Sequence, residues 1–110
     1  CALPIFTGRG DFTSIDPGQV ETAEGLGLLN TVVIDQHFIA RQRQNRLLSV
    51  LQVSRETMGI GIDEKMALVI EDEKRGSALG SSYIMVFERK NSPKQFAITL
   101  LKNGDTILLP

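Results

Sequence analysis

The residue of this sequence best suited to proton transfer is His37, its only histidine. It lies in the stretch TVVIDQHFIARQRQNR (31–46), directly after an apolar, β-branched run and before three arginines. An imidazole can serve as a general acid or base near neutral pH. A lone histidine at a strand end can equally be a structural hydrogen-bonding group. The position favours function, because functional groups of α/β sheets gather where strands end and the chain turns into a helix.

The second candidate is the acidic end of GIGIDE (59–64), above all Glu64. The two glycines of this stretch permit close approach of the backbone to its neighbours. The carboxylate can be an ordinary turn residue, or it can hold the tautomer of an imidazole in a nucleophile–base–acid relay. The sequence leaves the distance between His37 and Glu64 open, but both follow apolar segments typical of buried strands.

Three arginines, Arg41, Arg43 and Arg46, follow the histidine within nine residues. Arg43 and Arg46 are three apart and share a face of the predicted helix, which could simply be a solvated face. Arginine is also the residue suited to bidentate carboxylate recognition. The three arginines are therefore a candidate anion-binding surface beside His37.

No metal site and no cofactor are predicted. With one His and one Cys, and without H-E-x-x-H or C-x-x-C spacing, a zinc site would depend mostly on carboxylates. The GLG at 25–27 lacks a third glycine and a helix directly behind it, so it is a poor dinucleotide fingerprint. The single cysteine, Cys1, excludes an internal disulfide and fits a reducing cytoplasm.

Composition limits the partners. The 110 residues amount to one domain or less, with 42% hydrophobic and 23% charged residues as in ordinary globular proteins. The net charge of −1 gives no reason to expect a nucleic acid or an anionic membrane as partner. No apolar run approaches the ~18 residues of a spanning helix. We therefore expect a cytoplasmic protein.

The elements that must position these residues follow from the periodicity. Residues 1–24 are loop-like after the short apolar start ALPIF, because TGRGDFTSIDPGQ (7–19) is dense in Gly, Asp, Ser and Pro. Residues 40–53 have a helical apolar face, and EDEKRGS (71–77) reads as a charged hairpin turn. Strands are predicted at 31–35, 58–63, 67–72, 81–88, 95–101 and 106–109. The order of buried strand, helix and further strands indicates an α/β layer.

The motifs GLGLL, VVIDQHF, the spaced arginines, GIGIDE and ALVI, in this order, resemble the cyanophycinase family, serine peptidases of family S51 grouped with dipeptidase E. The resemblance runs from about Val20 to Ile70, with looser agreement through ITLLKNGDTILL. It implies a class I glutamine amidotransferase-like or flavodoxin-like fold: a mixed, largely parallel central sheet with flanking helices, extended by C-terminal hairpin strands. Family members release β-linked Asp-Arg dipeptides from the storage polymer cyanophycin by acyl transfer through a serine ester.

Roles follow from the resemblance residue by residue. His37 matches the general base of the family and Glu64 its acidic partner. Substrate-binding positions of the family are matched by Asp35, Gln36, Arg41, Arg43 and Arg46. Lys65-Met66 replace a more usual acidic-threonine pair, so a sister peptidase acting on other aspartyl peptides is an alternative.

The nucleophile of the family has no counterpart here. Its serine sits in a T-S-A-G-A type elbow upstream of DQHF, and no serine of this chain lies in such a context. We therefore expect residues 1–110 to be the C-terminal part of a single α/β domain, incomplete alone, with the serine on a preceding segment or a partner chain. Two alternatives remain: a truncated, non-catalytic fragment that folds or forms a homo-oligomer, and a nucleophilic role for Cys1.

Overall fold

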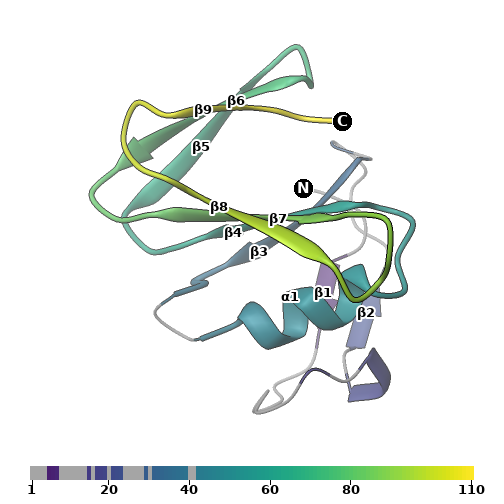
Figure 1. The fold of residues 1–110 in the computed structure, drawn as a ribbon. Coiled ribbons are helices and arrows are strands. Elements are labelled where there is room, and N and C mark those ends of the chain that lie inside the picture. Colours follow the sequence, from purple (N-terminus) through teal and green to yellow (C-terminus); the bar gives the residue numbers. More distant parts are fainter. Residues whose placement is uncertain are drawn as a thin grey trace.

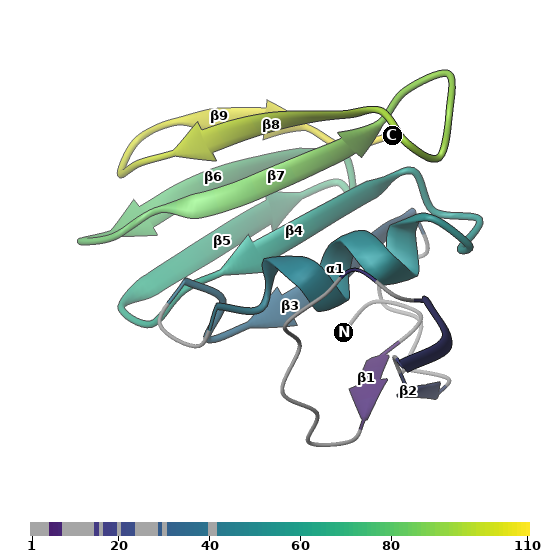
Figure 2. The same cartoon turned by 60° about the horizontal axis from the view of Figure 1, so that its bottom comes forward.

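Three layers make up the part of the chain that the computed structural model describes. The described residues are 5–7, 15, 17–19, 21–23, 29, 31–39 and 42–110. Helix α1 (Gln44–Leu51) lies on one side of a four-stranded sheet, and a three-stranded sheet lies on the other side (Figure 1). Turning the view shows the same stacking, with α1 running across the sheet beneath β4 (Figure 2).

The strands belong to three sheets. The four-stranded sheet has the order β3 (Val32–Gln36), β4 (Met58–Ile62), β7 (Ile84–Arg89), β8 (Phe96–Leu101). The three-stranded sheet has the order β5 (Met66–Glu71), β6 (Arg75–Gly80), β9 (Thr106–Leu108). A separate antiparallel pair joins β1 (Ile5–Thr7) to β2 (Glu21–Ala23), with the 3-10 turn η1 (Pro17–Gln19) between them. Residues 1–24, predicted to be loop-like after their apolar start, thus contain two short strands, and β1 overlaps that start.

The four-stranded sheet is mixed, and the prediction of a largely parallel central sheet is not confirmed in the described residues. The β3–β4 pairing is parallel, whereas β4–β7 and β7–β8 are antiparallel. Parallel neighbours need a crossover of a dozen or more residues. Residues 37–57, with α1, supply one between β3 and β4, but residues 90–95 are too few to join β7 and β8 in any way except a hairpin.

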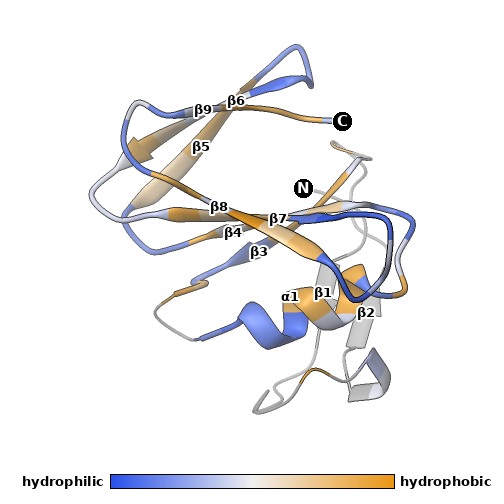
Figure 3. Cartoon of the chain, in the orientation of Figure 1, coloured by the Kyte–Doolittle hydropathy of each residue, from blue (hydrophilic) through white to orange (hydrophobic). Residues whose placement is uncertain are grey.

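Two apolar cores hold the layers together. Between the two larger sheets lies a cluster drawn from strands of both, including Ile60, Ala78 and Val86, which are fully buried. Between α1 and the four-stranded sheet lies a second cluster of Val33, Phe38, Leu47, Val50, Leu51 and Phe87. Figure 3 shows the matching pattern along α1, which begins hydrophilic and becomes hydrophobic where it packs on the sheet.

The helix is shorter than residues 40–53 predicted from its apolar face. It begins at Gln44 because the chain before it is a turn, with Gln42 at φ 51° and Arg43 at φ −90°. At its C-terminal end, Arg89 of β7 donates from Nη1 to the oxygen of Leu51, the last helical residue, at 2.5 Å and to that of Ser54 in the following turn at 3.0 Å. None of the helical segments in the described part of the chain has the length and apolar character of a membrane span.

Strand β6 was not predicted. Its sequence RGSALG contains two glycines and a serine, which have low strand propensity, and its first residues were assigned to a charged turn. The turn is confined to 72–74, where Asp72 and Glu73 both have positive φ, and the ladder resumes with the pair Glu71 and Arg75. The strand predicted at 81–88 accordingly begins later, at Ile84.

Candidate active site

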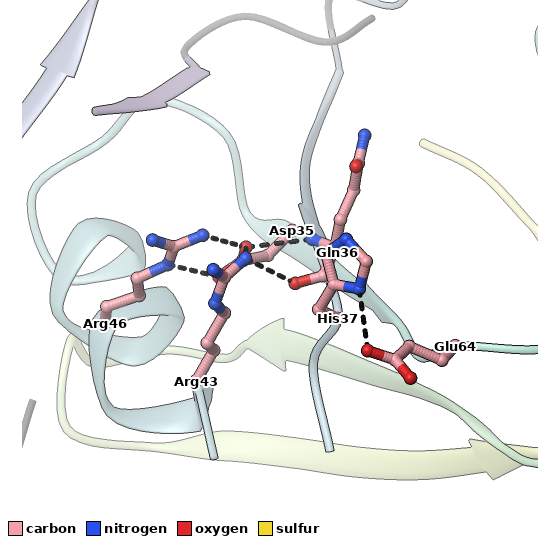
Figure 4. A network of polar contacts seen from close by, with 6 residues as sticks. All are labelled: Asp35, Gln36, His37, Arg43, Arg46 and Glu64. Carbon is pink, nitrogen blue, oxygen red and sulfur yellow. Dashed lines mark hydrogen bonds and ion pairs between the residues drawn. The ribbon is translucent and has the colours of Figure 1, made fainter. Parts of the chain in front are cut away.

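The predicted base and acid lie at the ends of two neighbouring parallel strands. Gln36 and Ile62 form the last pair of the β3–β4 ladder, so His37 and the turn carrying Glu64 leave the sheet at the same edge. The two side chains meet there, with His37 Nδ1 at 3.1 Å from Glu64 Oε1 (Figure 4). Since a carboxylate oxygen only accepts hydrogen bonds, Nδ1 donates, and in a neutral ring Nε2 keeps its lone pair.

The turn after β3 holds the imidazole in an uncommon backbone conformation. His37 has φ 52°, in the left-handed region that non-glycine residues seldom adopt. The next residue anchors the turn, because the buried Phe38 donates its N–H to the oxygen of Ile62 at 3.4 Å and places its ring 5.7 Å from that of Phe87, edge to face. Such strain persists only where the surroundings enforce it.

The glycines of β4 give Phe38 and α1 their space. A Cβ at Gly61 would overlap the ring of Phe38, and a Cβ at Gly59 would lie 2.7 Å from Leu51 Cδ1. The alternate residues of β4, such as Ile60, face the other core. The prediction that these glycines permit close approach is confirmed, and Phe38, which the sequence analysis passed over, is the residue that approaches Gly61.

His37 and Glu64 open onto a pocket with a volume of about 350 Å³. Their side chains are 45% and 53% exposed. The lining is made by Ile34, Gln36, His37, Ile62, Asp63, Glu64, Lys65, Met66, Ala67 and Leu68. It combines apolar walls with polar groups at one side, and none of these ten residues is a serine, threonine or cysteine. The pocket therefore offers proton transfer, but its described lining contains no hydroxyl or thiol nucleophile of the kind that an acyl transfer of this class uses.

A buried ionic cluster lies on the other face of β3. Asp35, which is 1% exposed, accepts hydrogen bonds from Arg46 through both of its oxygens, one of them from Nε at 2.7 Å (Figure 4). Arg43 Nη1 lies 3.6 Å from the same carboxylate and donates to the backbone oxygen of Gln36 at 2.7 Å. Asp35 also accepts the backbone N–H of Gln36 at 2.9 Å.

In the structure, the described residues that were predicted to bind substrate fall into two groups. Gln36 lines the pocket together with His37. The other group is the ion pair of Asp35 with both Arg43 and Arg46. The carboxylate that these two arginines contact therefore belongs to this chain. Arg41 and Cys1, for which functional roles were also predicted, lie outside the described residues.

In the part of the chain that the structure describes, no three His, Cys, Asp or Glu side chains come close enough together to hold a metal ion. The described groups are instead a hydrogen-bonded imidazole and carboxylate beside an open pocket. Such a pair can take a proton from a nucleophile and return it to a leaving group.

Comparison with known proteins gives a consistent result. Residues 3–77 match the profile described as peptidase family S51. The chain is 38% identical over 84 residues to the cyanophycinase of Geminocystis herdmanii, a match that covers 76% of this chain and 31% of that protein. It is 33% identical over 84 residues to the cyanophycinase of Trichormus variabilis, covering 76% of this chain and 28% of the relative. The chain thus spans less than a third of the length of these relatives.

Proposed function

Because the chain belongs to peptidase family S51, we propose that it supplies the general base and its acidic partner to a serine-type peptidase. His37 is the base and Glu64 the acid. The observation that carries the proposal is their 3.1 Å contact at the mouth of an open pocket. A carboxylate on Nδ1 leaves Nε2 as the nitrogen available to a nucleophile, which is the arrangement of a nucleophile–base–acid relay.

The proposed mechanism is acyl transfer. His37 Nε2 takes the proton of a serine hydroxyl as its oxygen attacks the scissile carbonyl, and Glu64 stabilises the imidazolium that forms. The tetrahedral intermediate collapses, the peptide C–N bond breaks, and the imidazolium gives its proton to the departing amine. His37 Nε2 then takes a proton from water as the water oxygen attacks the ester. The imidazolium returns this proton to the serine oxygen when the ester C–O bond breaks, which releases the acyl product as a carboxylic acid and restores the serine. Backbone N–H groups stabilise the oxyanion in both steps.

The serine lies outside the pocket lining described above. We propose that it comes from a segment preceding residues 1–110 or from a partner chain, and that these residues are one part of a single α/β domain. In support, the chain spans less than a third of the relatives named above. On this proposal the 110 residues hydrolyse nothing alone.

The proposed substrate is cyanophycin, the β-aspartyl-arginine polymer, cut to dipeptides from its end. The relatives named cyanophycinase are the support for this choice. Lys65 adds a cation to the lining of the pocket and Gln36 adds an amide, both of which suit polar groups of a peptide. The same lining also suits other β- or α-aspartyl peptides, so a sister aspartyl dipeptidase is the second candidate.

The ionic cluster has a supporting part in this proposal. The Arg46 side chain is 9% exposed and already bound by Asp35 at two points, so we assign both a positioning role. Arg43, with 20% of its side chain exposed, holds the backbone oxygen of Gln36, the residue before the base. The cluster thereby fixes the end of β3 from which the imidazole projects.

The test is hydrolysis by the assembled protein, in which this chain is combined with the segment that carries the serine. His37→Ala is expected to lower the rate of dipeptide release from cyanophycin by on the order of 10⁴-fold or more. Glu64→Gln should also cause a large loss, whereas Glu73→Gln, the same change in the exposed β5–β6 turn, should leave the rate unchanged. Full activity in His37→Ala would refute the proposal.

A further inference from the structure

We propose that Ser82, in the β6–β7 connection, is a positioning residue that aims Glu64 at His37. The proposal rests on the function proposed above and adds a residue to its machinery. Ser82 lies beyond residues 3–77, the part that matches the family profile. It also lies outside the pocket lining, so its influence must pass through the turn that carries Glu64.

The backbone of that turn sets the point from which the Glu64 side chain reaches His37. Since 53% of its side chain is exposed, packing supports it far less than it would a buried side chain. Glu64 is the second residue of a tight turn closed by the N–H of Met66 and the oxygen of Asp63 at 3.3 Å. Lys65, the third residue, has φ 64°, a conformation that turns of this kind usually give to glycine or asparagine. A turn with such a residue needs support from outside.

The β6–β7 connection contacts the turn on both sides of Glu64. Before Glu64, the Ser82 hydroxyl donates to Asp63 Oδ2 at 3.1 Å. After Glu64, the N–H of Ser81 donates to the oxygen of Lys65 at 3.2 Å, and the N–H of Ser82 lies 3.1 Å from Met66 Sδ. The residues before and after Glu64 are therefore held by one short segment, which fixes the backbone from which the Glu64 side chain reaches His37.

Gly80 allows this close contact. It has φ 136°, and a Cβ there would overlap the carbonyl oxygen of Lys65. Its N–H donates to Asn103 Oδ1 at 3.0 Å, which ties the segment to the β8–β9 loop. The segment that supports the turn is thus itself hydrogen-bonded to another part of the molecule.

Among the groups that the β6–β7 connection offers to the turn, the Ser82 hydroxyl is a side-chain group. The contacts from Ser81 and Gly80 run through their backbone atoms, so most substitutions there preserve them or disrupt the fold. The Ser82 hydroxyl can be removed as a single atom. Its loss removes the contact with Asp63 Oδ2 and leaves this segment to support the turn only through Lys65 and Met66, so the hydrogen bond between Glu64 and His37 Nδ1 should weaken.

The experiment reads the imidazole directly by NMR, because His37 is the only histidine of the chain. In the 110-residue chain, at a pH where titration shows the ring to be neutral, the ¹⁵N shifts of the ring report which nitrogen carries the hydrogen. The wild type is expected to show hydrogen on Nδ1. Ser82→Ala should shift both ring signals in the direction of those of Glu64→Gln, and Ser82→Thr, which keeps the hydroxyl, should retain the wild-type shifts.

The matched control is Ser92→Ala. Ser92 also uses its hydroxyl oxygen locally, accepting the N–H of Lys94 at 3.1 Å, but it lies in the loop beyond the opposite end of β7. It should leave the His37 signals unchanged. Amide spectra establish that each variant is folded, and if Ser82→Ala is not, Asp63→Asn weakens the same hydrogen bond from its other end.

The outcomes separate this inference from the proposed function. If Glu64→Gln shifts the ring signals and folded Ser82→Ala does not, the positioning role is refuted while the His37–Glu64 pair stands. If Glu64→Gln itself leaves the signals at wild-type values, the pair does not form and both proposals fail. Equal shifts in Ser82→Ala and Ser92→Ala would also overturn the inference, because the effect would not belong to the hydrogen bond.

Discussion

Substituting Asp35 by asparagine is expected to destabilise the protein far more than the loss of one charge at its surface. Asp35 is 1% exposed, and its carboxylate is bound at two points by Arg46. The asparagine side chain would keep nearly the same shape and one acceptor oxygen. The substitution therefore leaves packing almost intact and isolates the effect of charge.

The magnitude follows from burial. Removing one partner of a buried ion pair leaves the other charge uncompensated, at a cost of about 3–5 kcal/mol. We expect the lower end, about 3 kcal/mol, because the amide oxygen can still accept from Arg46. The free energy of unfolding of a domain is about 5–15 kcal/mol, so this loss is a large share of the total. Replacing both partners by apolar residues, as in Asp35→Leu with Arg46→Met, should recover part of it.

The assay is urea denaturation followed by far-UV circular dichroism, since the chain contains no tryptophan. The control is Glu88→Gln, which removes the same charge from an exposed pair, Lys90 Nζ to Glu88 Oε2 at 3.5 Å. That change should cost no more than about 1 kcal/mol. If Asp35→Asn and Glu88→Gln lower the free energy of unfolding equally, the buried cluster does not stabilise the fold as argued.

Two further changes test the packing around the site. Gly61→Ala should lower the free energy of unfolding by about 1–3 kcal/mol, because the new methyl group overlaps Phe38. Adding Phe38→Leu to this variant should relieve part of the loss. Urea denaturation measures both effects, and additive losses for the two substitutions would contradict the argument. Arg89→Met removes the donor to the carbonyl of Leu51 at the end of α1 and should cost about 1–2 kcal/mol, whereas the neighbouring Lys90→Met should cost little. Equal midpoints for the two variants in urea denaturation would show that the hydrogen bond from Arg89 does not stabilise the helix end.

The adjacency of the two candidate residues could be anticipated from the sequence. Continuous apolar runs before His37 and Glu64 indicate buried strands, and a helical segment between them supplies the crossover that parallel neighbours need. Parallel strands end at one edge, so residues that follow them meet there. The 3.1 Å contact agrees with this reasoning, although the sequence analysis left the distance open because periodicity carries no information about it.

The partners of the arginines and the support of the turn could not be anticipated. Arginine at 43 and 46 suits any carboxylate, and the sequence does not reveal that Asp35 points to the same face of the sheet. The contact of Ser82 with Asp63 joins residues 19 apart in the sequence, which the pairing of β5 with β6 brings together. Strand β6 was itself missed because its glycines and serine have low strand propensity. Such contacts depend on tertiary packing rather than on local pattern.

The salt bridge beneath β3 also decides which alignment of that strand is possible. Side chains alternate between the faces of a strand, so a slip of one position would take Asp35 away from Arg46 and bring Ile34 or Gln36 to the guanidinium instead. The buried Arg46 would then lack a carboxylate, which is strongly unfavourable. The ion pair therefore disfavours the alignments in which the imidazole emerges one residue too early or too late to reach its glutamate.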